Sequence, residues 1–150
     1  MAIINGGPGP DNLTGDQSAV PEADQIFGLA GDDILNGLLG DDTLSGGLGD
    51  DSLTGGGGAD IFVVDSGGAV ASVAQTDTIV DFSSLAGDVI DVSGLGISDF
   101  ATIQRLLSSS GGNSFLTFMN NGFEQTMTID RKSTRLNSSH IQKSRMPSSA

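Results

Sequence analysis

The sequence predicts an all-β fold in which short parallel strands stack as the coils of a solenoid. Three observations between residues 6 and 63 predict this fold class. A nine-residue unit recurs, glycine recurs within it at fixed positions, and a large apolar residue recurs at its eighth position. A unit this short cannot bury its apolar residue alone, so neighbouring units must stack to form a continuous core.

The nine-residue period runs without a slip from residue 28 onward. Its units are GLAGDDILN (28–36), GLLGDDTLS (37–45), GGLGDDSLT (46–54) and GGGGADIFV (55–63). An earlier unit, GGPGPDNLT (6–14), fits the pattern, and a degraded unit, AVPEADQIF (19–27), follows a four-residue insertion at 15–18. We expect this insertion to break the stacking register between the first unit and the others.

The last three residues of each unit are expected to form a strand whose middle, apolar residue points to one side. Two units facing each other make one coil of 18 residues, and coils stack about 4.8 Å apart. Stacking places Leu35 beside Leu53 in one ladder of the predicted core. The second ladder contains Ile26, Leu44 and Phe62.

Glycine and aspartate supply the predicted chemistry of the unit. Glycine at positions one, two and four lets the backbone take positive φ, coil tightly and turn its carbonyl oxygens inward. Aspartate at position six adds a carboxylate, and calcium prefers such oxygen ligands in a flexible shell of six to eight, whereas magnesium requires a stricter octahedron. The candidate calcium ligands are Asp11, Asp24, Asp33, Asp42, Asp51 and Asp60, with Gly28, Gly31, Gly37, Gly40, Gly46, Gly49 and Gly55.

The stacked coils predict two calcium sites in particular, one between Asp33 and Asp51 and one between Asp42 and Asp60. Sites that use Asp11 and Asp24 depend on the register that the insertion disturbs. An ion between stacked loops would neutralise carboxylates that otherwise repel each other, so we expect folding to be coupled to calcium. The calcium-free chain, highly acidic and with a thin core, is expected to be largely disordered.

The unit GGxGxDxUx resembles the hemolysin-type (RTX) calcium-binding repeat. The segment DTIVDFSSLAGDVIDVSGL (77–95) is similar to the closing segment of that family. The resemblance implies a right-handed parallel β-roll over residues 1–95, whose closing segment contributes oxygen ligands from Asp77, Asp81 and Asp88. It further implies a bacterial protein that the type I secretion machinery exports, directed by an uncleaved C-terminal signal, and that folds with calcium outside the cell.

Residues 96–129 are expected to cap the roll. The apolar spacing predicts a short helix over Ser98–Ser108, with Ser98 or Asp99 as its N-cap. Alternation over Ser114–Met119 and Gln125–Ile129, joined by Asn-Asn-Gly, predicts a hairpin. Phe115, Phe118 and Phe123 are expected in its core, and residues 77–92 are expected to form two short strands.

Residues 130–150 differ in composition from the rest of the chain and resemble translated sequencing-adapter DNA. We therefore expect a non-native tail and exclude it from the fold. Residues 1–129 hold 18 acidic residues and one basic residue, Arg105, for a net charge of −17. A chain of this charge should bind neither nucleic acid nor an anionic membrane surface.

Residues 1–129 contain no His, Cys or Lys, which removes the usual general base and nucleophiles and predicts that the chain is not an enzyme. No long apolar run predicts a membrane span, and no cleavable signal peptide is expected at the start. The glycine clusters lack the Lys of a phosphate loop, and no Glu is placed to complete an EF-hand. A flexible linker would not explain the phased apolar residue.

Three functional interpretations stay open. The first is a calcium-binding module of a secreted protein. The second is an accessory domain of an exported hydrolase, such as a protease or lipase. The third is a fragment of an adhesin.

Overall fold

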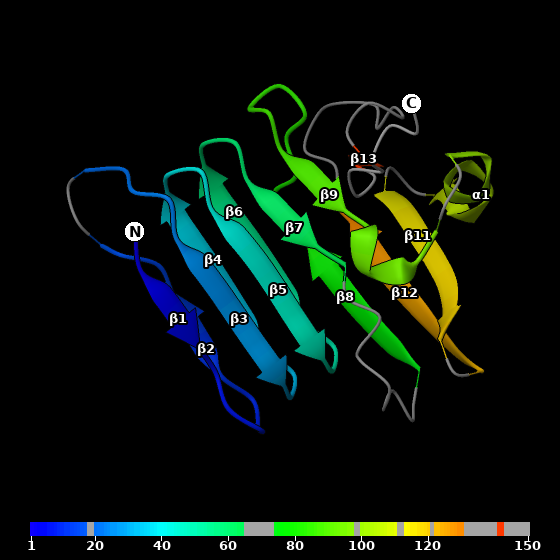
Figure 1. The fold of residues 1–150 in the computed structure, drawn as a ribbon, viewed down its shortest axis with the longest axis horizontal. Coiled ribbons are helices and arrows are strands. Elements are labelled where there is room, and N and C mark those ends of the chain that lie inside the picture. Colours follow the sequence, from blue (N-terminus) through cyan, green and yellow to red (C-terminus); the bar gives the residue numbers. More distant parts are fainter. Residues whose placement is uncertain are drawn as a thin grey trace, which may run out of the picture.

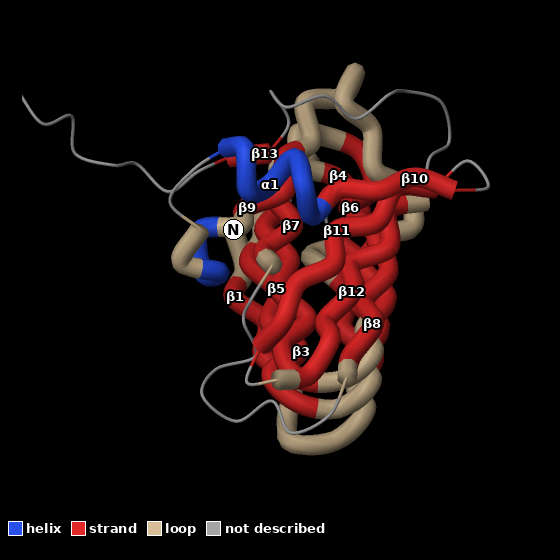
Figure 2. The backbone as a smooth tube through the Cα atoms, turned by 90° about the vertical axis from the view of Figure 1, so that its right-hand side faces the viewer, coloured by secondary structure: helices blue, strands red, loops and turns tan. Residues whose placement is uncertain are grey.

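The computed structural model describes residues 1–17, 20–64, 74–97, 100–110, 113–120, 122–130 and 141–142. Within these residues the chain forms a parallel β-solenoid of two facing sheets, as predicted (Figure 1). From β1 to β9, successive strands alternate between the sheets, so each strand stacks on the strand two before it. Figure 2 looks along the stack from the α1 end and shows the two sheets on opposite sides of the core.

Each sheet is a continuous ladder of strands. The six-stranded sheet contains, in spatial order, β1 (Ile3–Asn5), β3 (Gln25–Ala30), β5 (Thr43–Leu48), β7 (Ile61–Val63), β9 (Val89–Asp91) and β13 (Ile141–Gln142). The seven-stranded sheet contains β2 (Asn12–Thr14), β4 (Ile34–Leu39), β6 (Ser52–Gly57), β8 (Gln75–Ile79), β12 (Phe123–Ile129), β11 (Asn113–Asn120) and β10 (Leu107–Ser110). The two-residue strand β13 pairs with β9, although it belongs to the segment that was expected to be non-native.

The two predicted apolar ladders are confirmed. Leu35 pairs with Leu53 in the seven-stranded sheet, and Ile26, Leu44 and Phe62 follow one another in the six-stranded sheet. All five side chains are buried. Ile79 and Ile90 of the closing segment continue the two ladders. Because burying one such side chain contributes about 1.5–3 kcal/mol, the closing segment adds to the same core that the repeats build.

The insertion does not break the register, so that expectation was wrong. Leu13 pairs with Leu35, in phase with the later ladder. Of the inserted residues, 15–17 lie in the connection between β2 and β3, outside both sheets, and Ser18 lies outside the described residues. Gly15 N–H returns to the Asn36 carbonyl at 2.8 Å. A loop can absorb such an insertion because its length hardly affects the strands that it joins.

The strand β1 was not predicted. Ile4 pairs with Ile26 and extends the apolar ladder of the six-stranded sheet. The nine-residue frame, read backwards from Gly6, assigns Ile4 to position eight and Ala2 to position six. The chain thus begins with a partial unit that has alanine where the later units have aspartate.

The cap agrees with the sequence in its strands and differs at the end of its helix. The hairpin of β11 and β12 is antiparallel, as predicted, and β12 joins the repeats by pairing parallel with β8. The helix α1 (Phe100–Leu106) ends earlier than expected, because Leu107–Ser110 pair with β11 as β10. Both N-cap candidates lie outside the described residues. No helix in the described part of the chain is long and apolar enough to cross a membrane.

The phenylalanine predictions were right in part. Phe118 is partly buried and packs against the core, whereas Phe123 is 39% exposed, so its assignment to the core was wrong. Phe115 pairs with Thr128 on the opposite face of β11 from the buried Leu116. Alternation separates Phe115 from Phe118, since successive side chains of a strand point to opposite faces. Phe123 has the same parity as the buried Gln125 and Met127, but it is the first residue of β12, next to the hairpin turn.

Candidate metal centre

The position-six aspartates form two columns along the loops that join the sheets. Within each column, the backbone N–H of one aspartate donates to the Oδ1 atom of the aspartate one coil further on, at 2.7–3.1 Å. The first column consists of Asp11, Asp33, Asp51 and Asp77, and the second of Asp24, Asp42, Asp60 and Asp88. The closing segment therefore supplies the last carboxylate of each column.

The carboxylates inside the columns are buried next to one another. Asp33, Asp42, Asp51 and Asp60 are each at most 2% exposed. Burial, with a smaller contribution from neighbouring carboxylates, raises the pKa of Asp51 to about 6 and that of Asp60 to about 7. Burial also raises the pKa of Asp33 and of Asp42. Buried charges of one sign are costly unless a counter-charge lies close by.

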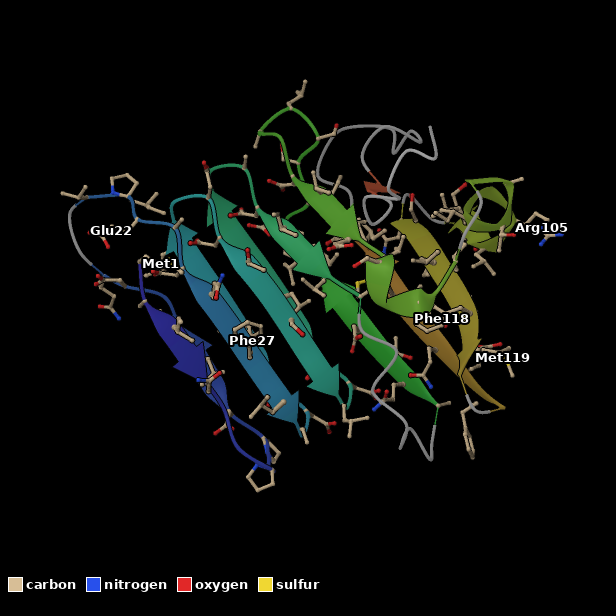
Figure 3. The ribbon with its side chains drawn as sticks, viewed as in Figure 1. Met1, Glu22, Phe27, Arg105, Phe118 and Met119 are labelled. Atoms are coloured by element: carbon tan, nitrogen blue, oxygen red, sulfur yellow. The ribbon has the colours of Figure 1, made fainter. Side chains whose placement is uncertain are left out.

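No side chain of the described residues supplies that counter-charge within the columns. Arg105 is the only Lys or Arg in the described part of the chain. It lies on α1, and Figure 3 shows its side chain at the far end of the solenoid, pointing away from the repeats. Among the described residues, the inner carboxylates of the columns therefore have no positively charged side chain beside them.

Three buried oxygen atoms lack a partner in the columns. The Oδ2 atoms of Asp33, Asp42 and Asp51 are buried without a hydrogen bond. Each faces the Cα of the position-one glycine of its own unit, where a Cβ atom would overlap it. At Gly28 and Gly37, the same Cβ would also overlap a carbonyl oxygen of the next coil, from Gly46 and Gly55. A buried, unpaired carboxylate oxygen beside a carbonyl oxygen fits a hard cation such as calcium.

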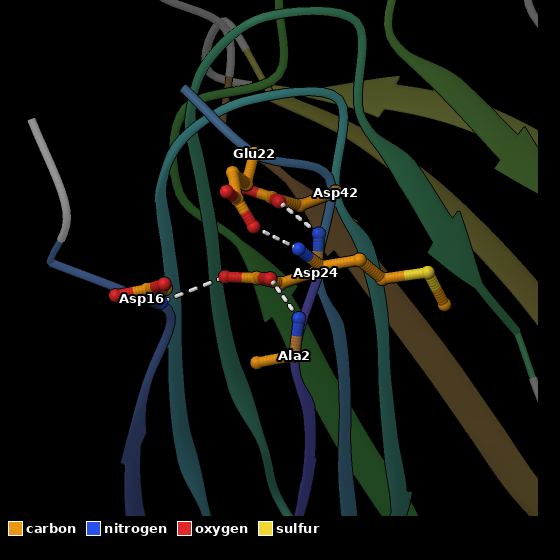
Figure 4. Close-up of polar contacts among 6 residues, drawn as sticks. Ala2, Asp16, Glu22, Asp24 and Asp42 are labelled. Atoms are coloured by element: carbon orange, nitrogen blue, oxygen red, sulfur yellow. Dashed lines mark hydrogen bonds and ion pairs between the residues drawn. The ribbon is translucent and has the colours of Figure 1, made fainter. Parts of the chain in front are cut away.

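Carboxylates at the ends of the columns are engaged by backbone N–H groups instead. Asp24 accepts bonds from Ala2 N–H and Asp16 N–H, which hold its pKa below the usual range (Figure 4). Asp88 Oδ2 accepts from Ser83 N–H at 2.7 Å. At the start of the first column, Asp11 Oδ2 accepts from Gly7 N–H at 2.6 Å.

Asp81 lies outside both columns. Its two carboxylate oxygens accept bonds from Gly55 N–H at 2.9 Å and Gly56 N–H at 2.8 Å. The structure thus brings Asp77 and Asp88 into line with the repeats, and it uses Asp81 to hold the last repeat turn. Sequence reasoning treated the three alike, because it had no information about the backbone N–H groups that surround them.

The glycines have two distinct roles. At position four, Gly31, Gly40 and Gly49 have positive φ, as expected, and their Cα atoms approach the backbone of the preceding coil. At position one, φ is not positive, so the expectation of positive φ there was wrong. Gly28, Gly37, Gly46 and Gly55 occur because a Cβ atom would enter the space beside the aspartate carboxylate.

No three acidic or histidine side chains converge on one point among the residues that the structure describes. A cation between the coils would therefore combine one or two carboxylates with backbone carbonyl oxygens. Calcium accepts such a mixed oxygen shell, because its coordination is flexible in number and geometry.

Leu29 and Leu38 occupy position two with a φ of 77°, in the left-handed region that disfavours a side chain. This conformation costs roughly 1–2 kcal/mol. Leu29 is 53% exposed, so the substitution Leu29→Gly should lose little packing and stabilise the fold by about 0.5–1 kcal/mol after the entropy cost of glycine. Thermal unfolding followed by circular dichroism measures the effect. Leu39→Gly is the control, since Leu39 is similarly exposed without positive φ, and it should destabilise.

The raised carboxyl pKa values predict that acid partly replaces the cation. A group with a raised pKa binds more protons in the folded state, so its contribution to stability falls as pH rises. Without divalent ions, the fold should gain stability as the pH is lowered from about 7, near the pKa of Asp60, to the ordinary pKa of an aspartate at 3.8. Circular dichroism in chelator across this range measures the gain. Asp51→Asn together with Asp60→Asn should flatten the profile, and an unchanged profile would contradict the assignment.

The fold is a parallel solenoid with glycine turns, and its columns of buried aspartates have no basic side chain beside them among the described residues. These features are typical of a metal-binding repeat protein. Residues 21–44 and 36–68 match the family described as RTX calcium-binding nonapeptide repeat (4 copies). Residues 21–68 therefore contain RTX calcium-binding nonapeptide repeats, and repeats of this family imply calcium binding. The resemblance inferred from the nine-residue unit is confirmed.

The solved structures with a similar fold include two subunits of one enzyme. The AlgE6R3 subunit of the Azotobacter vinelandii mannuronan C5-epimerase matches with a TM-score of 0.62 and 23% identity, over 96% of this chain and 84% of that one. The AlgE6R2 subunit of the same epimerase matches with a TM-score of 0.62 and 24% identity, over 93% and 91%. At these identities the likeness concerns the fold. No curated protein sequence matches the chain.

Proposed function

We propose that this chain is a calcium-binding module whose coils fold as the ions bind. The observation that carries the proposal is the set of three buried Oδ2 atoms, on Asp33, Asp42 and Asp51, that have no hydrogen-bond partner. Each lies beside a position-one glycine, where carbonyl oxygens of the next coil also approach in two of the three cases. A cation satisfies oxygens of this kind and neutralises the charge that they carry into the buried loop.

The ions would be held by the aspartates inside the columns, namely Asp33, Asp42, Asp51 and Asp60. Asp60 shares the geometry of the other three, because its Oδ2 atom also faces the position-one glycine of its unit, Gly55. The remaining candidates serve the ends. The Oδ2 atoms of Asp11, Asp24, Asp81 and Asp88 already accept a backbone N–H bond, whereas those of Asp33, Asp42 and Asp51 do not.

Calcium and folding would be coupled, since the columns exist only when coils stack. Stacking without the ion buries several carboxylates of like charge, whereas stacking with the ion neutralises them. The net charge of −17 over residues 1–129 opposes collapse in the same way. Calcium therefore supplies the charge balance that the sequence lacks.

The direct test is a calcium titration of residues 1–129, followed by circular dichroism. We expect little β signal in chelator, a cooperative gain with calcium at roughly 0.1–1 mM, the range of extracellular modules, and reversal by chelator. Magnesium at the same concentrations should give a much smaller gain. A spectrum indifferent to calcium would reject the proposal.

The coupling also supports a place of action outside the cell. A chain that folds only at calcium levels near the millimolar range would stay unfolded during export and fold on arrival. We propose on this basis a secreted bacterial protein that leaves through the type I machinery. Comparing intracellular and culture-medium fractions of an expressing cell, with and without that machinery, tests this directly.

A second candidate function is an accessory module within a larger exported enzyme. The observation that favours it is the fold shared with subunits of a mannuronan C5-epimerase, in which such modules belong to an enzyme. Residues 1–129 contain no His, Cys or Lys, so the chemistry would reside elsewhere in the polypeptide. Reading the gene past codon 129 distinguishes an enzyme, such as a hydrolase, from an adhesin with further repeats.

A further inference from the structure

A second row of aspartates lies next to the columns, at position five of the unit. Asp32, Asp41 and Asp50 are exposed or lie on exposed loops, in contrast to the buried position-six carboxylates. Each accepts, through Oδ1, the backbone N–H of the position-five residue one coil further on. These donors are Asp50 at 3.0 Å, Ala59 at 2.8 Å and Thr76 at 2.7 Å.

The bonds of the two rows run in opposite directions. At position six, the N–H of the earlier coil donates to the carboxylate of the later coil, as from Asp33 to Asp51 at 2.8 Å. At position five, the N–H of the later coil donates to the carboxylate of the earlier coil, as from Asp50 to Asp32. Two neighbouring loops are therefore joined by a reciprocal pair of bonds, which we call a clasp.

A clasp occurs at three places, and these places match the unpaired oxygens. The clasps join 32–33 to 50–51, 41–42 to 59–60, and 50–51 to 76–77. The position-six aspartates on the earlier side are Asp33, Asp42 and Asp51. These are the same three residues whose Oδ2 atoms are buried without a partner.

Where position five is not aspartate, only the position-six bond of the clasp is found among the described contacts, and we call this bond the inner bond. Pro10 and Ala23 stand at position five in the first two units, and Asp11 and Asp24 each make the inner bond alone. At Ala59, the position-five side chain is a methyl group, which lies against the closing segment, since a Cβ atom at Gly87 would be 3.1 Å from Ala59 Cβ. The row of position-five carboxylates therefore ends before the closing segment.

We propose that Asp32, Asp41 and Asp50 are positioning residues for calcium binding. They fix the distance between neighbouring loops through hydrogen bonds, so that a carboxylate oxygen and the carbonyl oxygens meet around each ion. They act through the acceptor atom and not through charge. The inference rests on the proposed calcium function and adds residues that do not themselves hold the ion.

A pair of triple variants separates the hydrogen bond from the charge. One variant replaces Asp32, Asp41 and Asp50 by alanine, and the other replaces the same three residues by asparagine. Both remove three negative charges, but only asparagine keeps the Oδ1 acceptor. We expect the calcium concentration at half-folding to rise about two- to fivefold in the alanine variant, from the loss of three modest hydrogen bonds. The asparagine variant should stay within about twofold of the unchanged protein.

Amide hydrogen exchange in the calcium-loaded protein gives a local readout. The N–H groups of Asp50, Ala59 and Thr76 should be protected in the unchanged protein and in the asparagine variant, and should exchange faster in the alanine variant. The N–H of Asp33, which donates to the position-six carboxylate of Asp51, is the internal control. Equal midpoints for the two triple variants, or unprotected donors in the unchanged protein, would overturn the proposal. An unchanged protein that does not respond to calcium would instead reject the function on which it rests.

Discussion

Replacing Asp33, Asp42 and Asp51 together by asparagine should abolish the response of the fold to calcium. Asparagine keeps the Oδ1 acceptor that receives the backbone N–H of the preceding coil, so the ladder of hydrogen bonds can persist. It replaces the unpaired, buried Oδ2 atom by an amide donor, which cannot bind a cation. Calcium affinity measured by isothermal titration should fall roughly a hundredfold or more, because ligand charge sets the affinity of such sites.

The matched control removes the same number of charges from the same loops. The substitution of Asp32, Asp41 and Asp50 by asparagine leaves the buried carboxylates in place and should preserve the calcium response. Similar losses in both triple variants would show that total charge, and not the unpaired oxygens, governs calcium binding. That result would contradict the assignment of the metal centre.

The substitution Gly46→Ala should strongly weaken the calcium-dependent folding of the repeats. A Cβ atom at Gly46 would overlap three atoms of the Asp51 side chain, including Oδ2. Overpacking of this kind costs about 1–3 kcal/mol, and the carboxylate can avoid it only by leaving the site. We expect a calcium midpoint at least about tenfold higher and a lower melting temperature, measured by circular dichroism.

Gly9→Ala is the control for this change. Gly9 belongs to the first unit, has no positive φ, and a Cβ atom there meets nothing within 4 Å. It should therefore fold with calcium like the unchanged protein. Comparable damage at Gly9 would mean that a side chain harms the repeats wherever it is placed, and that the space beside the carboxylate does not explain the glycines at position one.

The sequence predicted the solenoid and its two ladders because a strict period carries that information without any tertiary contact. Leu35 and Leu53 are 18 residues apart, and nothing but stacking in coils of two units brings both into the core. The same frame, read backwards from Gly6, contained β1, although a partial unit with Ala2 at position six did not stand out as a repeat.

The sequence set Asp11 and Asp24 apart from the two preferred sites, but because of a register break that the structure does not have. The hydrogen bonds that distinguish the aspartates could not be predicted from the sequence. Asp24 and Asp42 occupy the same position of the unit, yet Asp24 accepts two backbone N–H bonds and Asp42 has an unpaired oxygen. The difference depends on the path of residues far away in the chain, such as Ala2, which is 22 residues distant. The role of Asp32, Asp41 and Asp50 was missed for the same reason, since its donors lie one coil away.

Because the strands alternate between two sheets, the number of units sets both the length of the solenoid and the side on which its last loop lies. Each additional unit lengthens the stack by about half of the 4.8 Å strand spacing and turns the next loop to the opposite side. A gain or loss of eighteen residues, which is one full coil, would therefore shift the cap along the solenoid axis without changing the side that it faces. A gain or loss of nine would point it the other way. The parity of the unit count thus sets the direction in which the two ends of the solenoid face.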